Sequence, residues 1–120
     1  GKTLREMCRE GLDPDTEQEL KTAFTRFVIR LHECGVYFRS LHLGNVVCMP
    51  DRRFGLIDIA DARIGSSRLG EHQRVRNLRR LQGIAGESEW VDFFMVINAR
   101  GVVEQGHDCH DRDARNSHDR

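Results

Sequence analysis

The clearest helical pattern in the chain covers residues 16–34. Apolar side chains recur there at intervals of three and four residues, which places them on one face of a helix. Thr16 and Glu19 have capping-box spacing at its start, and Gly35 follows its end, where a left-handed glycine often terminates a helix. The pattern predicts one long helix, with an apolar face made of Leu20, Ala23, Phe24, Phe27, Val28 and Leu31.

A shorter amphipathic stretch precedes this helix. Leu4, Met7 and Cys8 follow the spacing i, i+3, i+4, and Gly11 can close the turn. We therefore expect a short helix within residues 2–9.

The spacing changes after Gly35 to short runs rich in β-branched and aromatic residues. Three such runs, at 36–38, 46–49 and 54–59, predict three short strands. Residues 50–53 have the composition and length of a hairpin turn between the second and third strands. Residues 39–45 form a polar loop between the first and second strands, and loops on a rigid scaffold often carry function.

Helical spacing returns over residues 71–82, where arginines surround a narrow apolar face of Val75, Leu78 and Leu81. We interpret these arginines as a solvated surface. Residues 90–97 fit a helix or a strand equally well. After Glu104 the chain is almost wholly polar, so we expect residues 104–120 to be a disordered tail.

These elements predict an α+β, mostly helical fold with a small β-hairpin region. The 120 residues allow one domain, which we place at residues 1–103. The formal net charge of zero leaves no overall field to attract nucleic acid, and the basic helix has no interleaved aromatics, so we expect no nucleic-acid partner. The four cysteines contain no CxxC pair, which argues against a zinc knuckle.

The most informative residues are Ser-Leu-His-Leu-Gly-Asn, ending at Asn45, and Leu-Ile-Asp-Ile-Ala, which contains Asp58. They resemble the catalytic loop and metal-binding motif of the protein-kinase-like superfamily. Within that superfamily, the residues of these two motifs are most similar to those of the lipopolysaccharide kinases that phosphorylate Kdo or heptose, including proteins of the toluene tolerance type. The resemblance covers residues 1–82 and implies the carboxy-terminal lobe of that fold.

The resemblance also implies functions for individual residues. Asn45 and Asp58 match positions that hold Mg²⁺ and, through it, ATP. A hard cation prefers such amide and carboxylate oxygens. His42 matches a position that small-molecule kinases often fill with histidine, and Ser40 matches the catalytic carboxylate that orients the acceptor hydroxyl.

The implied parent activity is ATP-dependent phosphorylation of a lipopolysaccharide core sugar. It would take place in the cytoplasm, at the inner face of the bacterial inner membrane, and peripheral membrane contact would accompany it.

Two departures from the family pattern bear on activity. Ser40 replaces a carboxylate, and loss of a general base typically costs about 10²–10⁴-fold in rate. Neighbouring Arg39 can offset phosphoryl charge but cannot accept a proton. The chain also has no glycine-rich phosphate loop, so we expect the amino-terminal lobe to be missing and the fragment to be inactive alone. The alternative is a pseudokinase or binding module with a degenerate loop.

Overall fold

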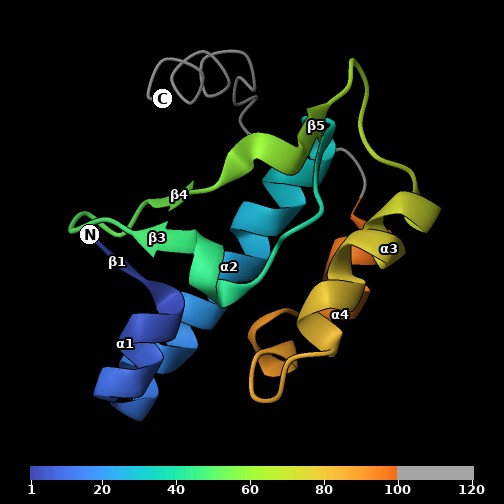
Figure 1. Cartoon of the computed structure of the whole chain (residues 1–120). Coiled ribbons are helices and arrows are strands. Elements are labelled where there is room, and N and C mark those ends of the chain that lie inside the picture. Colours follow the sequence, from blue (N-terminus) through green and yellow to red (C-terminus); the bar gives the residue numbers. More distant parts are fainter. Residues whose placement is uncertain (100–120) are drawn as a thin grey trace.

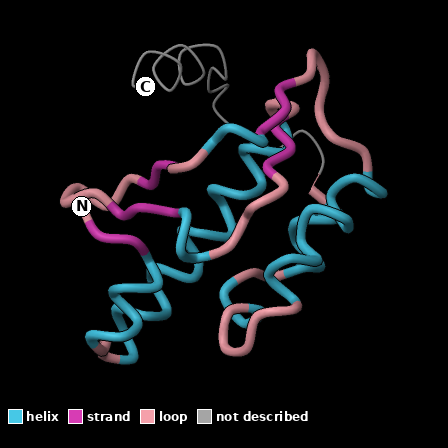
Figure 2. Tube along the Cα trace, in the orientation of Figure 1, coloured by secondary structure: helices cyan, strands magenta, loops and turns pink. Residues whose placement is uncertain are grey.

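Four α-helices and five short strands make up residues 1–99, which are the part of the chain that the computed structural model describes (Figures 1 and 2). The predicted polar tail, 104–120, and the last residues of the predicted domain lie outside the described residues.

Helix α2, Pro14–Glu33, is the central element and confirms the predicted long helix. It begins two residues earlier than expected, because Asp13 caps it by accepting a 3.1 Å hydrogen bond from the Thr16 backbone N–H. The predicted capping box at Thr16 was wrong, since Pro14 already sits in the first turn, where a missing N–H costs nothing. The helix ends as predicted at Gly35, whose φ of +81° is left-handed.

The amino-terminal segment forms strand β1, Lys2–Thr3, and helix α1, Leu4–Glu10. Thr3 and Glu6 make a reciprocal capping box at the start of α1, which sequence analysis did not identify. Strand β1 pairs antiparallel with β3, Val46–Cys48, and β3 pairs antiparallel with β4, Phe54–Leu56. This order, β1-β3-β4, confirms the predicted hairpin.

The third predicted strand is shorter than residues 54–59. It ends at Leu56 because Asp58 adopts a left-handed conformation, with φ 59° and ψ 50°, which breaks the pleat. A 3-10 helix, Ile59–Asp61, follows. The chain then forms β5, Ala62–Ile64, which was not predicted and pairs antiparallel with β2, Val36–Phe38.

Helix α3, Glu71–Gln82, has the predicted bounds, and residues 90–97 resolve into a 3-10 helix, Ser88–Trp90, followed by helix α4, Phe93–Asn98. Helix α4 packs against both α2 and α3, and α3 also contacts β2 (Figure 1). The interpretation of all the α3 arginines as solvated was wrong for Arg74, which is 1% exposed. Its guanidinium joins three helices by bonding Glu33 of α2 at 2.6 Å and the Val96 carbonyl of α4 at 2.9 Å.

The core lies between α2 and the strands and continues to buried side chains of α3 and α4. Phe24 of α2 meets Phe54 of β4 edge to face, with ring centroids 6.2 Å apart, and this contact seats the hairpin on the helix. The fold is therefore α+β and mostly helical, as predicted. Within residues 1–99, no helix is long and apolar enough to cross a membrane.

Candidate functional site

The loop between β2 and β3 brings together three of the four predicted site residues, Ser40, His42 and Asn45. A 3-10 helix, Leu43–Asn45, forms its second half, and the His42 ring caps this helix by accepting a 3.1 Å hydrogen bond from the Gly44 backbone N–H. The Asn45 side-chain Nδ2 donates to the Ser40 carbonyl oxygen at 3.1 Å. The loop is thus closed by its own predicted site residues.

The carboxamide oxygen of Asn45 remains available to a ligand. Its Nδ2 is held by the Ser40 carbonyl and lies 3.2 Å from His42 Nε2, whereas Oδ1 accepts no hydrogen bond within the described chain. An amide whose nitrogen is fixed presents its oxygen in a defined direction, which suits a metal or a hydroxyl donor.

Asp58, the fourth predicted residue, lies at the same end of the β3–β4 hairpin as Asn45. The ladder pairs Val46 with Leu56, and the Ile57 backbone N–H then donates to the Asn45 carbonyl at 3.0 Å. Asp58 is therefore one residue beyond the cross-strand neighbour of Asn45. Directly opposed residues in an antiparallel pair have Cα atoms about 4.5–5.5 Å apart.

The backbone at Asp58 is unusual. Arg52, in the hairpin turn, is the only other non-glycine residue with positive φ in the described part of the chain. Left-handed non-glycine residues cost free energy and often occur at functional sites. The Asp58 carboxylate is exposed, and within residues 1–99 it makes no ion pair.

The two oxygen-bearing side chains fit a magnesium ion in their chemistry. Mg²⁺ usually takes only one or two protein oxygens and keeps waters or phosphates as its other ligands. Among residues 1–99 there is no group of three or more His, Cys, Asp or Glu side chains that could hold a metal by themselves. Asn45 and Asp58 would therefore form a partial site that a phosphate ligand completes.

The surroundings of His42 disfavour the charged form of its imidazole. Burial lowers its pKa below the usual value of 6.5, and the positive charges of Arg5 and Arg80 lower it further, with Glu87 opposing them. Nδ1 accepts from Gly44 and lies 3.1 Å from the Arg5 guanidinium. This histidine orients the loop through its hydrogen bond to Gly44.

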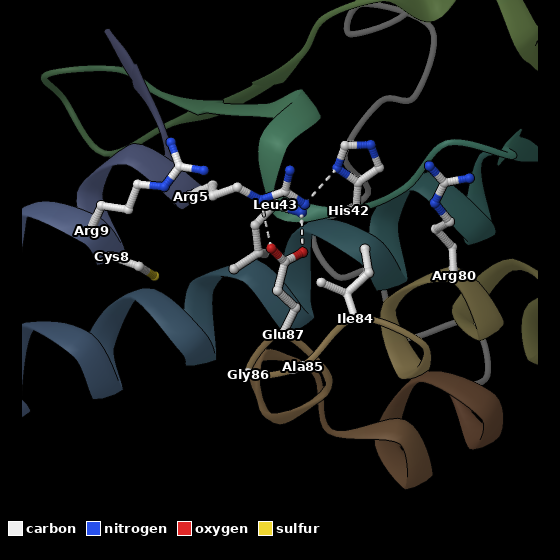
Figure 3. A pocket seen from close by; sticks show the side chains of 10 residues that line it. All are labelled: Arg5, Cys8, Arg9, His42, Leu43, Arg80, Ile84, Ala85, Gly86 and Glu87. Atoms are coloured by element: carbon white, nitrogen blue, oxygen red, sulfur yellow. Dashed lines mark hydrogen bonds and ion pairs between the residues drawn. The ribbon is translucent and has the colours of Figure 1, made fainter.

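A buried carboxylate that sequence analysis missed holds the β2–β3 loop in place through a backbone hydrogen bond. Glu87 is 6% exposed and lies in the segment between α3 and the Ser88–Trp90 turn. Its Oε1 accepts the Leu43 backbone N–H at 2.9 Å, and its Oε2 accepts Arg5 Nε at 2.7 Å (Figure 3). Arg5 in turn contacts His42, so α1, the loop and residue 87 are joined by one polar network.

These residues border a pocket of about 640 Å³. Figure 3 shows that its lining comes from α1, the loop, the end of α3 and the segment that contains Glu87. Arg9 and Arg80 also line it and form no ion pair within the described residues. No signal in the sequence pointed to Glu87, because its partners are 44 and 82 residues away along the chain.

Ser40 is half-buried at the position where the resemblance leads us to expect a carboxylate. Its backbone carbonyl anchors Asn45, so the residue has a structural contact whatever its side chain does.

Comparison of the chain with protein-family models, with curated proteins and with solved structures found no match.

Proposed function

We propose that this chain is the metal-binding, carboxy-terminal lobe of a kinase-like phosphotransferase. The observation that carries the proposal is the register of the β3–β4 hairpin, which brings Asn45 and the left-handed Asp58 to one end of the same ladder. The resemblance to the kinase-like superfamily rests on the sequence motifs around these two residues. The proposal of cation binding rests on their side-chain oxygens.

Each residue then has a distinct role. Asn45 and Asp58 would hold the cation, which would supply positive charge opposite the phosphate oxygens of ATP. His42 keeps the loop in shape through its bond to Gly44. Ser40 stands where the acceptor hydroxyl would be oriented, and its hydroxyl is a weak substitute for a carboxylate.

The proposed acceptor is a sugar hydroxyl of the lipopolysaccharide core, at the cytoplasmic face of the inner membrane. This assignment depends on the motif resemblance, and it requires an amino-terminal lobe as partner to complete the nucleotide cleft. A pocket formed from one side loses the convergent contacts that bind a small molecule tightly. The chain alone is therefore expected to show no turnover.

Ser40 favours a second candidate, a pseudokinase or binding module. In that case the loop keeps its shape through Asn45 and His42 while the chemistry is lost. Isothermal titration of the purified chain with Mg-ATP separates the two candidates. Micromolar affinity would favour the binding module, whereas the kinase-lobe proposal expects weak binding or none.

A chromosomal substitution tests the catalytic proposal in the cell. Asp58→Asn, introduced into the gene of the bacterium that carries it, should remove one phosphate from its core lipopolysaccharide, as read by mass spectrometry. Asp51→Asn is the matched control, because Asp51 lies in the turn at the other end of the hairpin and pairs with Arg53. Unchanged phosphate content in the Asp58 variant would contradict the proposal.

Ser40→Asp extends the same experiment. If Ser40 marks weakened catalysis, restoring the carboxylate should raise the phosphorylated fraction. If it lowers that fraction, the acceptor is oriented by another group and the role given to Ser40 is wrong.

A further inference from the structure

A second pocket, of about 670 Å³, lies between the β2–β5 ladder, the segment 65–69 and helix α3. Four arginines from four different segments line it, and none of the described aspartate or glutamate side chains does. They are Arg39 after β2, Arg63 in β5, Arg68 in the connecting segment and Arg76 in α3. The pocket is therefore strongly cationic although the chain as a whole has no net charge.

The strand register explains why these side chains share one face. Val36 and Phe38 of β2 are buried in the core, so the alternation of a strand turns Tyr37 and Arg39 to the opposite face. Tyr37 is the cross-strand partner of Arg63, which places the Arg63 side chain on that face as well. The pocket is thus a direct product of the β2–β5 pairing.

Helix α3 supplies the opposite wall. Gln73 and Arg76 are three residues apart, so they are neighbours on one helix face. The segment between β5 and α3 arches from the ladder to the helix (Figure 1) and contributes Ser67. Hydroxyl and amide groups from Tyr37, Ser67 and Gln73 therefore accompany the guanidinium groups.

Most of the positive charge is uncompensated. Arg68 is neutralised by Glu33, which it contacts at 2.9 Å, and it also donates to the Ala99 carbonyl. Among the side chains that the structure describes, which do not include that of Asp61, none forms an ion pair with Arg39, Arg63 or Arg76. Positive side chains around one cavity repel one another, and a bound anion relieves this repulsion.

Backbone contacts fix the walls of this pocket. Asn77 of α3 donates to the Phe38 carbonyl of β2 at 2.6 Å, which holds the helix against the ladder. The Gly65 N–H donates to the Gly35 carbonyl at 2.9 Å. A Cβ at Gly35 would lie 2.5 Å from the Ser67 carbonyl oxygen, so this close approach needs glycine.

We propose that this pocket binds the phosphate group of a small phosphorylated molecule, with a sugar phosphate as the ligand class. Arginine forks suit phosphate oxygens, and several arginines around one cavity suit a phosphate dianion. The hydroxyl and amide groups in the lining suit the hydroxyls of a sugar. The inference needs neither a metal nor a nucleotide, so it stands independently of the proposed function.

The test is an NMR titration of the whole chain, with backbone amide shifts as the readout. The probes are inorganic phosphate, glucose 6-phosphate and glucose. Saturating shifts at residues 35–39, 63–69 and 73–76 are expected with both phosphates and not with glucose. Tighter binding of glucose 6-phosphate identifies a phosphate ester as the ligand, and equal binding shows that the site takes free phosphate.

The matched variants are Arg76→Gln and Arg79→Gln, on the same helix. Arg79 is exposed and does not line this pocket. Loss of one charge-assisted contact should weaken phosphate binding about tenfold in the Arg76 variant and leave it unchanged in the Arg79 variant. Equal weakening in both, or no saturation with either phosphate below about 10 mM, would overturn the proposal.

Discussion

Glu87 and Leu43 are joined by a 2.9 Å hydrogen bond from the Leu43 backbone N–H to the Glu87 carboxylate, across 44 residues of sequence. The same carboxylate holds Arg5, whose guanidinium contacts His42. The loop that carries three predicted site residues is therefore fixed by a residue outside every motif. This relationship makes the first prediction.

Replacing Glu87 with alanine should destabilise the protein by about 1–3 kcal/mol, because the buried Leu43 N–H would lose its acceptor. Glu87→Gln keeps an oxygen for Leu43 and should cost less. Urea unfolding measures both effects, and amide shifts of His42 and Gly44 report the loop. Glu89→Gln is the control, since its side chain is 70% exposed. A loop unchanged in Glu87→Ala would contradict the support role.

Arg74 should be far more important for stability than the other α3 arginines. Its buried guanidinium bonds Glu33 and the Val96 carbonyl, so Arg74→Met leaves these acceptors without a donor and should cost about 1–3 kcal/mol, since Arg68 still pairs with Glu33. Arg79→Met, on the exposed face, should change stability by less than about 0.5 kcal/mol. A double-mutant cycle with Glu33→Gln measures the coupling. Equal effects of the two methionine variants would refute the assignment.

Acid should destabilise the fold through His32. Burial is the main cause that lowers the pKa of this imidazole from 6.5 to about 4, with Arg74 also lowering it and the Asn77 hydrogen bond and Glu33 opposing. Between these two pH values His32 binds a proton in the unfolded chain but not in the folded chain. The free energy of unfolding should therefore fall by about 3 kcal/mol as the pH drops from about 6.5 to about 4.

Urea unfolding across that pH range checks the slope, and His32→Gln should flatten it. His72→Gln, at an exposed position on α3, should not. A smaller slope will remain in the His32 variant because the pKa of His42 is also lowered. An unchanged slope in His32→Gln would assign the acid sensitivity to other groups.

The local elements were predictable because their signals are local. The spacing of apolar residues predicted α2 and α3, and Gly35 predicted where α2 ends. Strands β1 and β5 were missed since each has only two or three residues and exists through pairing with a distant strand. The end of β4 was misplaced because left-handed backbone at Asp58 leaves no mark in an apolar run.

The candidate site was predictable only in part. Ser40, His42, Asn45 and Asp58 stood out through motif spacing, and hairpin pairing explains how Asn45 and Asp58 reach one edge. Arg74 was interpreted as a surface charge and Glu87 belonged to no motif, since a single charged residue has the same local context whether it is exposed or buried. Their importance comes from tertiary partners that no local pattern encodes.

The central claim is that Asn45 and Asp58 form a divalent-cation site at one end of the β3–β4 hairpin. Mn²⁺ accepts the same oxygen ligands as Mg²⁺ and broadens NMR signals of nearby nuclei even when it binds weakly. Trace Mn²⁺ added to the labelled chain should therefore broaden the amides of Asn45, Val46, Ile57 and Asp58. The broadening should disappear in Asp58→Asn and persist in Asp51→Asn. Sharp signals at these four amides, or broadening that survives Asp58→Asn, would contradict the account.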